Sequence, residues 1–168
     1  DRPKTVFETA MLGRYPHHKS LWKDDPEDIA VVENALREFD LTHLSARSIE
    51  TLSGGESQRL ALAQLVAQAP TLYLLDEPSN HLDLAHQLKG LQRLKEKVTS
   101  NRAALVMASH DINLVSQMCD HVLLLMGDGS YLAGRVSEIL QEEYLSEAFG
   151  CRIRRVESGK EAFFFPST

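Results

Sequence analysis

Short apolar segments alternate with longer helical patterns after Pro70, and this alternation restricts the fold more than any other feature of the chain. The apolar segments are Leu72–Leu75, Ala103–Ala108 and Val122–Met126. Alternating strands and helices are typical of a largely parallel sheet covered by helices. The sequence therefore predicts an α/β fold for this part of the chain. The helix between the first two strands should bury one stripe of side chains, namely Leu84, Leu88, Leu91, Leu94 and Val98.

The first 70 residues contain no strong strand signal and predict helices joined by polar turns. One helix is expected at Thr5–Leu12. A second should begin with Asp25 as its N-cap and Pro26 at its first position, and should end at Asp40. Beyond the α/β part, Gly127–Ser130 predicts a tight hairpin turn. One or two short helices should then precede a final hairpin that pairs Arg152–Val156 with Ala162–Phe165, and these helices are expected within Val136–Phe149.

A third helix should begin at Ser53 and stop before Pro70. Ser53 and Glu56 have the S-x-x-E spacing of a capping box. The intervening Gly54 and Gly55 leave backbone amides open at the positive end of the helix dipole, where an anion can approach closely. A capping box alone explains Ser53 and Glu56 equally well, but it does not explain two helix-weakening glycines in the first turn. We therefore expect a phosphate-binding helix start.

Two carboxylates, Asp76 and Glu77, end the first apolar strand. The carboxyl edge of an open α/β sheet is where such folds bind ligands. One carboxylate there can hold Mg²⁺ while its neighbour orients or deprotonates a water in line with a terminal phosphate. We assign Asp76 to the metal and Glu77 to the water. The alternative is a polar turn that merely follows a buried strand.

His110 follows the second strand and should reach the same edge, near Glu77. A neutral imidazole there could bind a terminal phosphate or steady the catalytic acid. A helix cap or a surface group is the alternative. No segment reads G-x-x-x-x-G-K-[ST], the loop that cradles nucleotide phosphates. Gly13–Ser20 matches only at its first glycine and at Lys-Ser, and Pro16 removes an amide that such a loop needs, so we predict an ordinary loop there.

Composition excludes several other functions. Eighteen Lys plus Arg against 24 Asp plus Glu leaves a net charge of −6, which disfavours broad binding to nucleic acid backbones. Cys119 and Cys151 do not suggest a disulfide framework, so a reducing cytoplasm is expected. The longest apolar stretch, Val122–Met126, is far too short to span a membrane. Any role at a membrane would need a partner subunit.

Four segments taken in order resemble motifs of an ATP-binding cassette (ABC) ATPase. Leu52–Arg59 resembles the signature motif, Leu72–Glu77 the Walker B strand, Ser79–Asp83 the D-loop and Ser109–Asp111 the H-loop. The resemblance implies the C-terminal part of a P-loop NTPase core with parallel strands, plus an α-helical subdomain. It divides the chain into a helical subdomain (1–70), the C-terminal half of the nucleotide-binding core (71–150) and a terminal hairpin extension (151–168). The half of the core with the P-loop would precede Asp1.

The resemblance also implies roles for individual residues, with ATP and Mg²⁺ as cofactors. The signature residues would bind the γ-phosphate of an ATP held by a second copy of the subunit, and the D-loop would lie at the dimer seam. Asp76 would hold Mg²⁺, Glu77 would act as general base and His110 would contact the γ-phosphate. The signature residues are Ser53, Gly54, Gly55 and Glu56, and the D-loop residues are Asn80, Leu82 and Asp83.

Glu56, where many members have glutamine, and the sequence Asn80-His81-Leu82-Asp83 resemble importers of iron-siderophore, haem or cobalamin. The implied partners are a second ATPase subunit, transmembrane permease subunits and, indirectly, a substrate-binding protein, without nucleic acid. The implied location is cytoplasmic, peripheral at the inner face of the cell membrane. Two alternatives stay open: a non-enzymatic assembly fragment, and a soluble ABC ATPase that does not serve transport. Without a P-loop, the chain alone should be inactive as an ATPase and should self-associate through an uncovered sheet edge or face.

Overall fold

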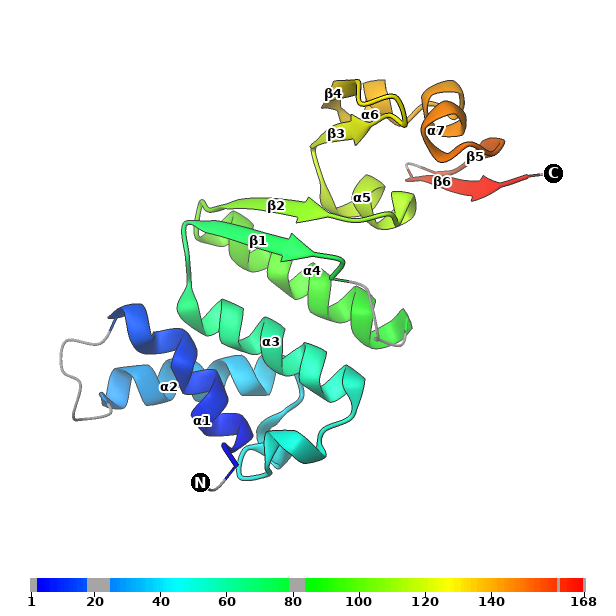
Figure 1. Ribbon diagram of the computed structural model, residues 1–168. Coiled ribbons are helices and arrows are strands. Elements are labelled where there is room, and N and C mark those ends of the chain that lie inside the picture. The colour runs from blue at the N-terminus through cyan, green and yellow to red at the C-terminus, as the bar shows by residue number, and fades with distance from the viewer. Residues whose placement is uncertain (1–2, 18–24, 79–83, 160, 168) are drawn as a thin grey trace. The chain divides into compact units, whose positions relative to one another are not determined.

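The computed structural model describes residues 3–17, 25–78, 84–159 and 161–167 (Figure 1). The chain divides into two compact units, Asp1–Ala108 and Ser109–Thr168, and each is described by itself. The first unit contains the helical part of the chain and one parallel strand pair. The described residues of the second contain two antiparallel strand pairs with three short helices. The mixed α/β class and the helical region predicted from the sequence are therefore present.

Side-chain caps stand at the start of three helices in the first unit. Helix α1 (Val6–Met11) begins after Thr5, and α2 (Pro26–Glu38) begins after Asp25, whose carboxylate accepts the N–H of Glu27. Two short 3₁₀ helices follow, η2 (Thr42–Leu44) and η3 (Ile49–Thr51), and α3 (Gly54–Gln68) then begins after Ser53. The predicted ends of α2 and α3 agree with the structure to within two residues.

The segment Leu12–His17 is a 3₁₀ helix, η1, rather than the predicted loop. Gly13 allows this because η1 lies directly against α3, and a Cβ at this position would overlap with the carbonyl of Gln64. Arg14 then reaches the end of α3 and donates to the carbonyl of Ala67 at 2.7 Å. The loop prediction was wrong here because packing against another helix, and not local sequence, orders the segment. The rest of that predicted loop, residues 18–20, lies outside the described residues.

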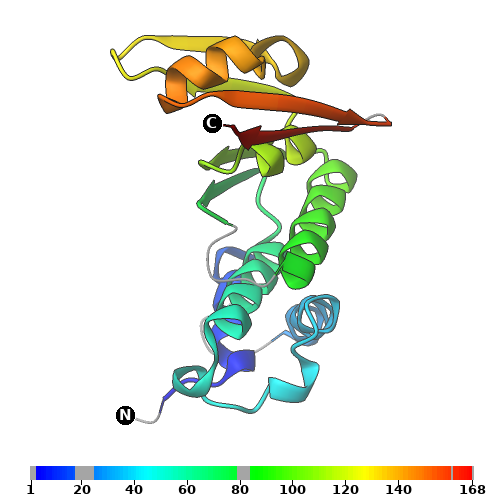
Figure 2. The same cartoon turned by 90° about the vertical axis from the view of Figure 1, so that its right-hand side faces the viewer.

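Strands β1 (Leu72–Asp76) and β2 (Ala104–Ala108) form a parallel pair connected by α4 (Leu84–Ser100), as predicted. One face of the pair packs on the core of the first unit through Tyr73, which is fully buried, and through the half-buried Leu75 and Leu105. Figure 2 shows α3 running beside α4. Both helices contribute buried side chains to the same core. The opposite face of the pair is apolar and exposed, through Leu72, Leu74 and Val106.

The second unit begins with α5 (Ile112–Met118) and continues with the antiparallel hairpin of β3 (His121–Leu125) and β4 (Tyr131–Arg135). The prediction that Val122–Met126 would join the parallel sheet was wrong, because β3 pairs antiparallel with β4, and within the described residues the parallel pairing is that of β1 with β2. Two short helices, α6 (Val136–Ile139) and α7 (Glu142–Phe149), precede a second hairpin of β5 (Ile153–Ser158) and β6 (Glu161–Pro166). The turn of the first hairpin, the C-terminal hairpin and both short helices match the sequence-based prediction, whereas strand β4 had not been predicted.

The C-terminal hairpin is held on both strands by helices of its own unit (Figure 2). Helix α7 packs against β5, and α5 packs against β6. The amide of Asn113 donates to the carbonyl of Phe164 at 2.9 Å and accepts its N–H at 2.7 Å, so it occupies the outer edge of β6. Across the described part of the chain, no helix is both long and apolar enough to traverse a bilayer.

Candidate functional site

The start of α3 and the end of β1 lie at the same end of the first unit. The chain runs along α3, turns at Ala69 and returns along β1, so the helix N-terminus and the strand C-terminus face the same way (Figure 1). A direct hydrogen bond joins them, because the side-chain amide of Gln58 donates to the carbonyl of Pro78 at 3.3 Å. The two segments predicted to carry the chemistry are therefore neighbours in one folded unit.

The two carboxylates at the end of β1 have different surroundings. Asp76 is the last strand residue, pairs in register with Ala108 and is exposed. Glu77 is half-buried, and its N–H donates to the carbonyl of Ala108 at 2.9 Å. An exposed carboxylate fits Mg²⁺, which is usually held by one or two carboxylates together with water and substrate phosphates. Within the described ranges, this region included, no group of three His, Cys, Asp or Glu side chains could hold a metal ion.

Glu77 has a left-handed backbone, with φ of 44°. This conformation is uncommon for a residue other than glycine and costs about 1–3 kcal/mol, so it persists only where the surroundings impose it. The following Pro78 is buried and favours extended conformations in the residue before it. The turn is thus a local departure from what its own sequence prefers, at the position assigned to the general base.

The start of α3 has the predicted capping box. The N–H of Ser53 donates to a Glu56 carboxylate oxygen at 2.7 Å, and the N–H of Glu56 donates to the Ser53 hydroxyl at 3.3 Å. The backbone N–H of Ser53 lowers the pKa of Glu56 below its ordinary 4.5, and the Ser53 hydroxyl and the nearby Arg47 guanidinium act in the same direction. Gly54 and Gly55 occupy the first two helical positions, where N–H groups have no acceptor within the helix.

These features can bind an anion. Ser53 and Gly54 are exposed, so a phosphate can reach the backbone amides at the helix N-terminus. Glu56 lies close by, but its carboxylate is engaged by Ser53 and faces Arg47 at 4.0 Å. The capping interpretation and the phosphate-binding interpretation of this segment are therefore compatible. The cap uses the N–H groups of Ser53 and Glu56, and the N–H groups of Gly54 and Gly55 between them are left for an anion.

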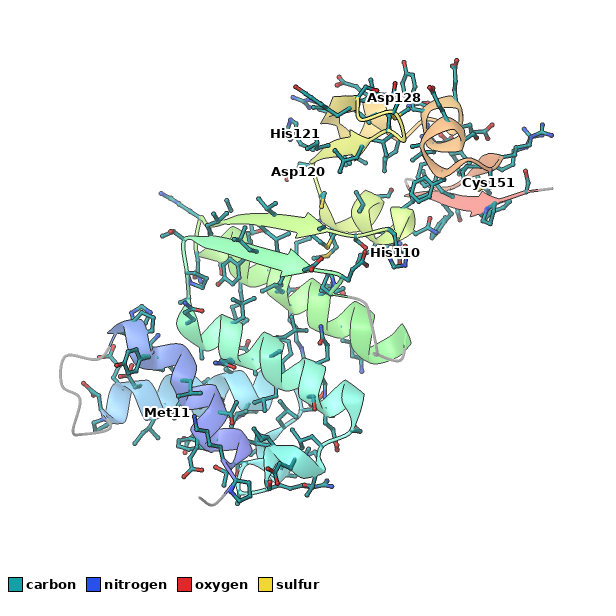
Figure 3. The ribbon with its side chains drawn as sticks, viewed as in Figure 1. Met11, His110, Asp120, His121, Asp128 and Cys151 are labelled. Atoms are coloured by element: carbon teal, nitrogen blue, oxygen red, sulfur yellow. The ribbon has the colours of Figure 1, made fainter. Side chains whose placement is uncertain are left out.

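The other predicted site residues are placed less completely. His110 is exposed and stands just before α5, as Figure 3 shows, and it belongs to the second unit. The Asp111 carboxylate beside it caps α5 by accepting the N–H of Leu114 at 3.0 Å. The expected proximity of His110 to Glu77 involves both units and stays a prediction. Asn80, Leu82 and Asp83 lie outside the described residues.

Sequence reasoning gave no role to Gln58, although Gln58 lies within the signature-like segment Leu52–Arg59, and it did not identify Arg47 as part of this region. Gln58 acts on a backbone carbonyl twenty residues later, and no residue pattern reveals a partner of that kind. Arg47 precedes Glu56 by nine positions and faces it because η3 turns the chain back. The one available signal for Gln58 was its place in the second turn of a helix whose start had already been selected.

Comparisons with known proteins identify the chain's relatives. Residues 2–80 match the sequence model described as "ABC transporter". The chain is 36% identical over 151 residues to the achromobactin transport ATP-binding protein CbrD of Dickeya dadantii, covering 89% of this chain and 56% of that protein. It is 39% identical over 153 residues to the hemin import ATP-binding protein HmuV of Pseudomonas fluorescens, covering 88% and 58%.

Among solved structures, the chain is similar to an inward-facing structure assigned to the metal-chelate type of ABC transporter. The TM-score is 0.85 at 30% identity, over 99% of this chain and 68% of that one. The chain spans little more than half the length of the curated relatives named above.

Proposed function

We propose that this chain, which belongs to the ABC transporter family, is the part of an importer's ATP-binding subunit that contains the signature helix and the Walker B strand. The cargo class we propose is a metal chelate of the iron-siderophore, haem or cobalamin kind. The printed names of the relatives support this choice, because they include importers of achromobactin, hemin and cobalamin. Glu56 and the Asn80-His81-Leu82-Asp83 sequence support it independently.

The proposed chemistry divides between two copies of the subunit. The helix start at Ser53–Gly55, with the Gly54 and Gly55 amides as its open donors, binds the terminal phosphate of an ATP held by the other copy, and the Glu56 carboxylate caps that helix start through the Ser53 N–H. Asp76 is the Mg²⁺ ligand, directly or through water, and the bound ion neutralises phosphate charge. Glu77 orients and deprotonates the attacking water. His110 hydrogen-bonds the terminal phosphate.

The observation that carries this proposal is the Gln58 hydrogen bond to the Pro78 carbonyl, which joins the signature helix to the turn that contains Glu77. Phosphoryl transfer depends mainly on positioning and electrostatic stabilisation. A helix start that binds phosphate and a carboxylate that activates water are useful only if their separation is held constant. In this chain the Gln58 hydrogen bond joins the helix that starts at Ser53 to the turn that contains Glu77.

The proposed partners are a second copy of the ATPase subunit, transmembrane permease subunits and, indirectly, a substrate-binding protein. The proposed place of work is the cytoplasmic face of the cell membrane, at the permease. Residues 1–70 serve as the helical subdomain, 71–150 as the C-terminal half of the nucleotide-binding core and 151–168 as an extension. Asn80, Leu82 and Asp83 form the part of the dimer seam contributed by the D-loop.

The 168 residues alone are proposed to be inactive, because no segment has the P-loop sequence and Glu77 cannot act on a nucleotide that is not held. The test is Mg²⁺-dependent phosphate release, measured with malachite green. It compares this chain with the product of the intact gene, meaning the protein that also contains the half of the core with the P-loop. We expect turnover only in the latter, lost in Glu77→Gln and kept in Glu33→Gln, an exposed control on α2. Turnover by the isolated chain that Glu77→Gln abolishes would contradict the proposal.

A nucleotide titration separates this proposal from the non-enzymatic alternative. Tight ATP binding by the product of the intact gene, with dimer formation dependent on ATP, is the expected result. Dimerisation of that product without any nucleotide affinity would instead indicate an assembly module that joins partners through exposed apolar surface, such as Leu72, Leu74 and Val106. The sequence of the DNA upstream of the Asp1 codon is a second check, because a P-loop should be encoded there.

A further inference from the structure

We propose that Gln58 is a positioning residue for Glu77. Its side-chain amide holds the carbonyl of Pro78 and thereby maintains the left-handed backbone that directs the Glu77 side chain. This inference rests on the role proposed above for Glu77, and it gives a role to a residue of the Leu52–Arg59 segment for which the resemblance implied none. Gln58 does not need to touch the substrate for this role.

Two hydrogen bonds bracket the Glu77 turn. On one side the Glu77 N–H donates to the Ala108 carbonyl at 2.9 Å, which fastens the turn to β2. On the other side the Pro78 carbonyl accepts from Gln58 at 3.3 Å, which fastens it to α3. Pro78 has no N–H, so the peptide between the two residues offers no donor of its own. On this side of Glu77 the turn is therefore restrained through the Pro78 carbonyl, which accepts from Gln58.

The backbone conformation decides which way Glu77 faces. Side chains alternate between the two faces of a strand, so an extended Glu77 would share the face of Tyr73 and Leu75, which packs on the core. The left-handed φ of 44° ends this alternation directly after Asp76. Because Pro78 favours an extended residue before it, the turn needs an external restraint to stay as it is.

Gln58 also connects this turn to the phosphate-binding helix start. It lies on the second turn of α3, four residues after Gly54, while the capping box of Ser53 and Glu56 fixes the first turn. A change at the helix start is therefore transmitted to the Glu77 turn through one side chain. In the proposed dimer, phosphate binding at α3 and water activation at Glu77 of the same copy are coupled in this way.

Hydrogen exchange tests the structural half of this inference without any need for activity. In the product of the intact gene, Gln58→Leu removes the donor while keeping a side chain of similar size. We expect the Glu77 amide to exchange about 2–10-fold faster, the effect of losing one hydrogen bond. Amides in the interior of α3 and in β1 before Asp76 should keep their rates. Gln64→Leu is the matched control, because Gln64 lies near the other end of the same helix, against Gly13.

Kinetics test the functional half. Gln58→Leu should lower kcat for phosphate release by a similar factor and leave the KM for ATP unchanged, because the amide orients the base and does not bind nucleotide. Gln58→Glu keeps the shape but replaces the donor with an acceptor, so its loss of kcat should be at least as large. Gln64→Leu should keep the kcat of the parent protein.

Several results would overturn the inference. These are an unchanged Glu77 exchange rate, a uniform rise at all amides that indicates only lower global stability, or faster Glu77 exchange with an unaltered kcat. A parent protein with no ATPase activity would refute the proposed function and the catalytic role of Gln58 together. The exchange result would then still show whether Gln58 holds the turn.

Discussion

Arg14 joins three helical segments of the first unit through two short hydrogen bonds. Its Nε donates to the Asp28 carboxylate at 2.7 Å, which links η1 to α2, and its Nη1 donates to the carbonyl of Ala67 at 2.7 Å, in the last turn of α3. The side chains of Arg14 and Asp28 are only 12% and 8% exposed. A guanidinium at a helix C-terminus is also favoured by the helix dipole. We therefore predict that Arg14→Met strongly destabilises the first unit.

The magnitude follows from burial. Removing one partner of a buried ion pair costs about 3–5 kcal/mol of unfolding free energy, because the remaining charge stays in a poorly solvated place. The structure provides a matched comparison in the pair of Lys97 and Glu38, which has the same 2.7 Å separation but side chains that are 37% and 33% exposed. Exposed pairs contribute about 0–1 kcal/mol. Because of burial alone, the loss of unfolding free energy should be larger for Arg14→Met than for Lys97→Met by roughly threefold or more.

Urea denaturation followed by circular dichroism measures both costs. The variants are Arg14→Met, Asp28→Asn and their double variant, with Lys97→Met as control. We expect the double variant to lose about 1–3 kcal/mol less unfolding free energy than the sum of the two single variants, because substitutions of residues in contact are usually not additive. The reasoning would be refuted if Arg14→Met cost no more than Lys97→Met, or if the Arg14 and Asp28 costs were simply additive.

Further predictions concern backbone contact and capping. Gly13→Ala should cost about 1–3 kcal/mol in urea denaturation, because its Cβ would overlap with the carbonyl of Gln64, whereas Gly127→Ala, with open space around it, should cost much less. Ser53→Ala should cost about 1 kcal/mol through loss of the helix cap. Because the folded state lowers the pKa of Glu56, its ionised form stabilises the fold above pH 4.5, and this contribution is lost as the pH falls through the lowered folded value. Glu56→Gln should flatten that acid-side loss in denaturation curves, and an unchanged pH profile would contradict the assignment.

Local sequence was sufficient for most of the secondary structure. Helix caps at Asp25 and Ser53 depend on groups two or three residues away, so they can be identified in the sequence before any packing is known. The apolar strand before Asp76 and the turn at Gly127–Ser130 are equally local. The family resemblance rested on these same short segments, and the comparisons confirmed it.

The candidate site was predictable only in part. Sequence spacing correctly selected the start of α3 as a capped helix with two glycines and the end of β1 as a pair of carboxylates. The roles of Asp76, Glu77 and His110 stay predictions. The left-handed backbone of Glu77 could not be foreseen, because its own sequence, with a proline next, favours an extended residue there.

The sequence by itself thus determined where helices and strands begin and end and which short segments carry the motifs, because caps, turns and apolar periodicity act over a few neighbouring residues. Only the tertiary structure decided that Gly13–His17 would be helical, that Arg14 would bind Asp28, and that Gln58 would hold Pro78. These contacts join positions 14 to 20 residues apart or depend on a second helix. They exist because segments far apart in the sequence pack together, which no local pattern encodes, and the Gln58 contact joins α3 to the turn that contains Glu77.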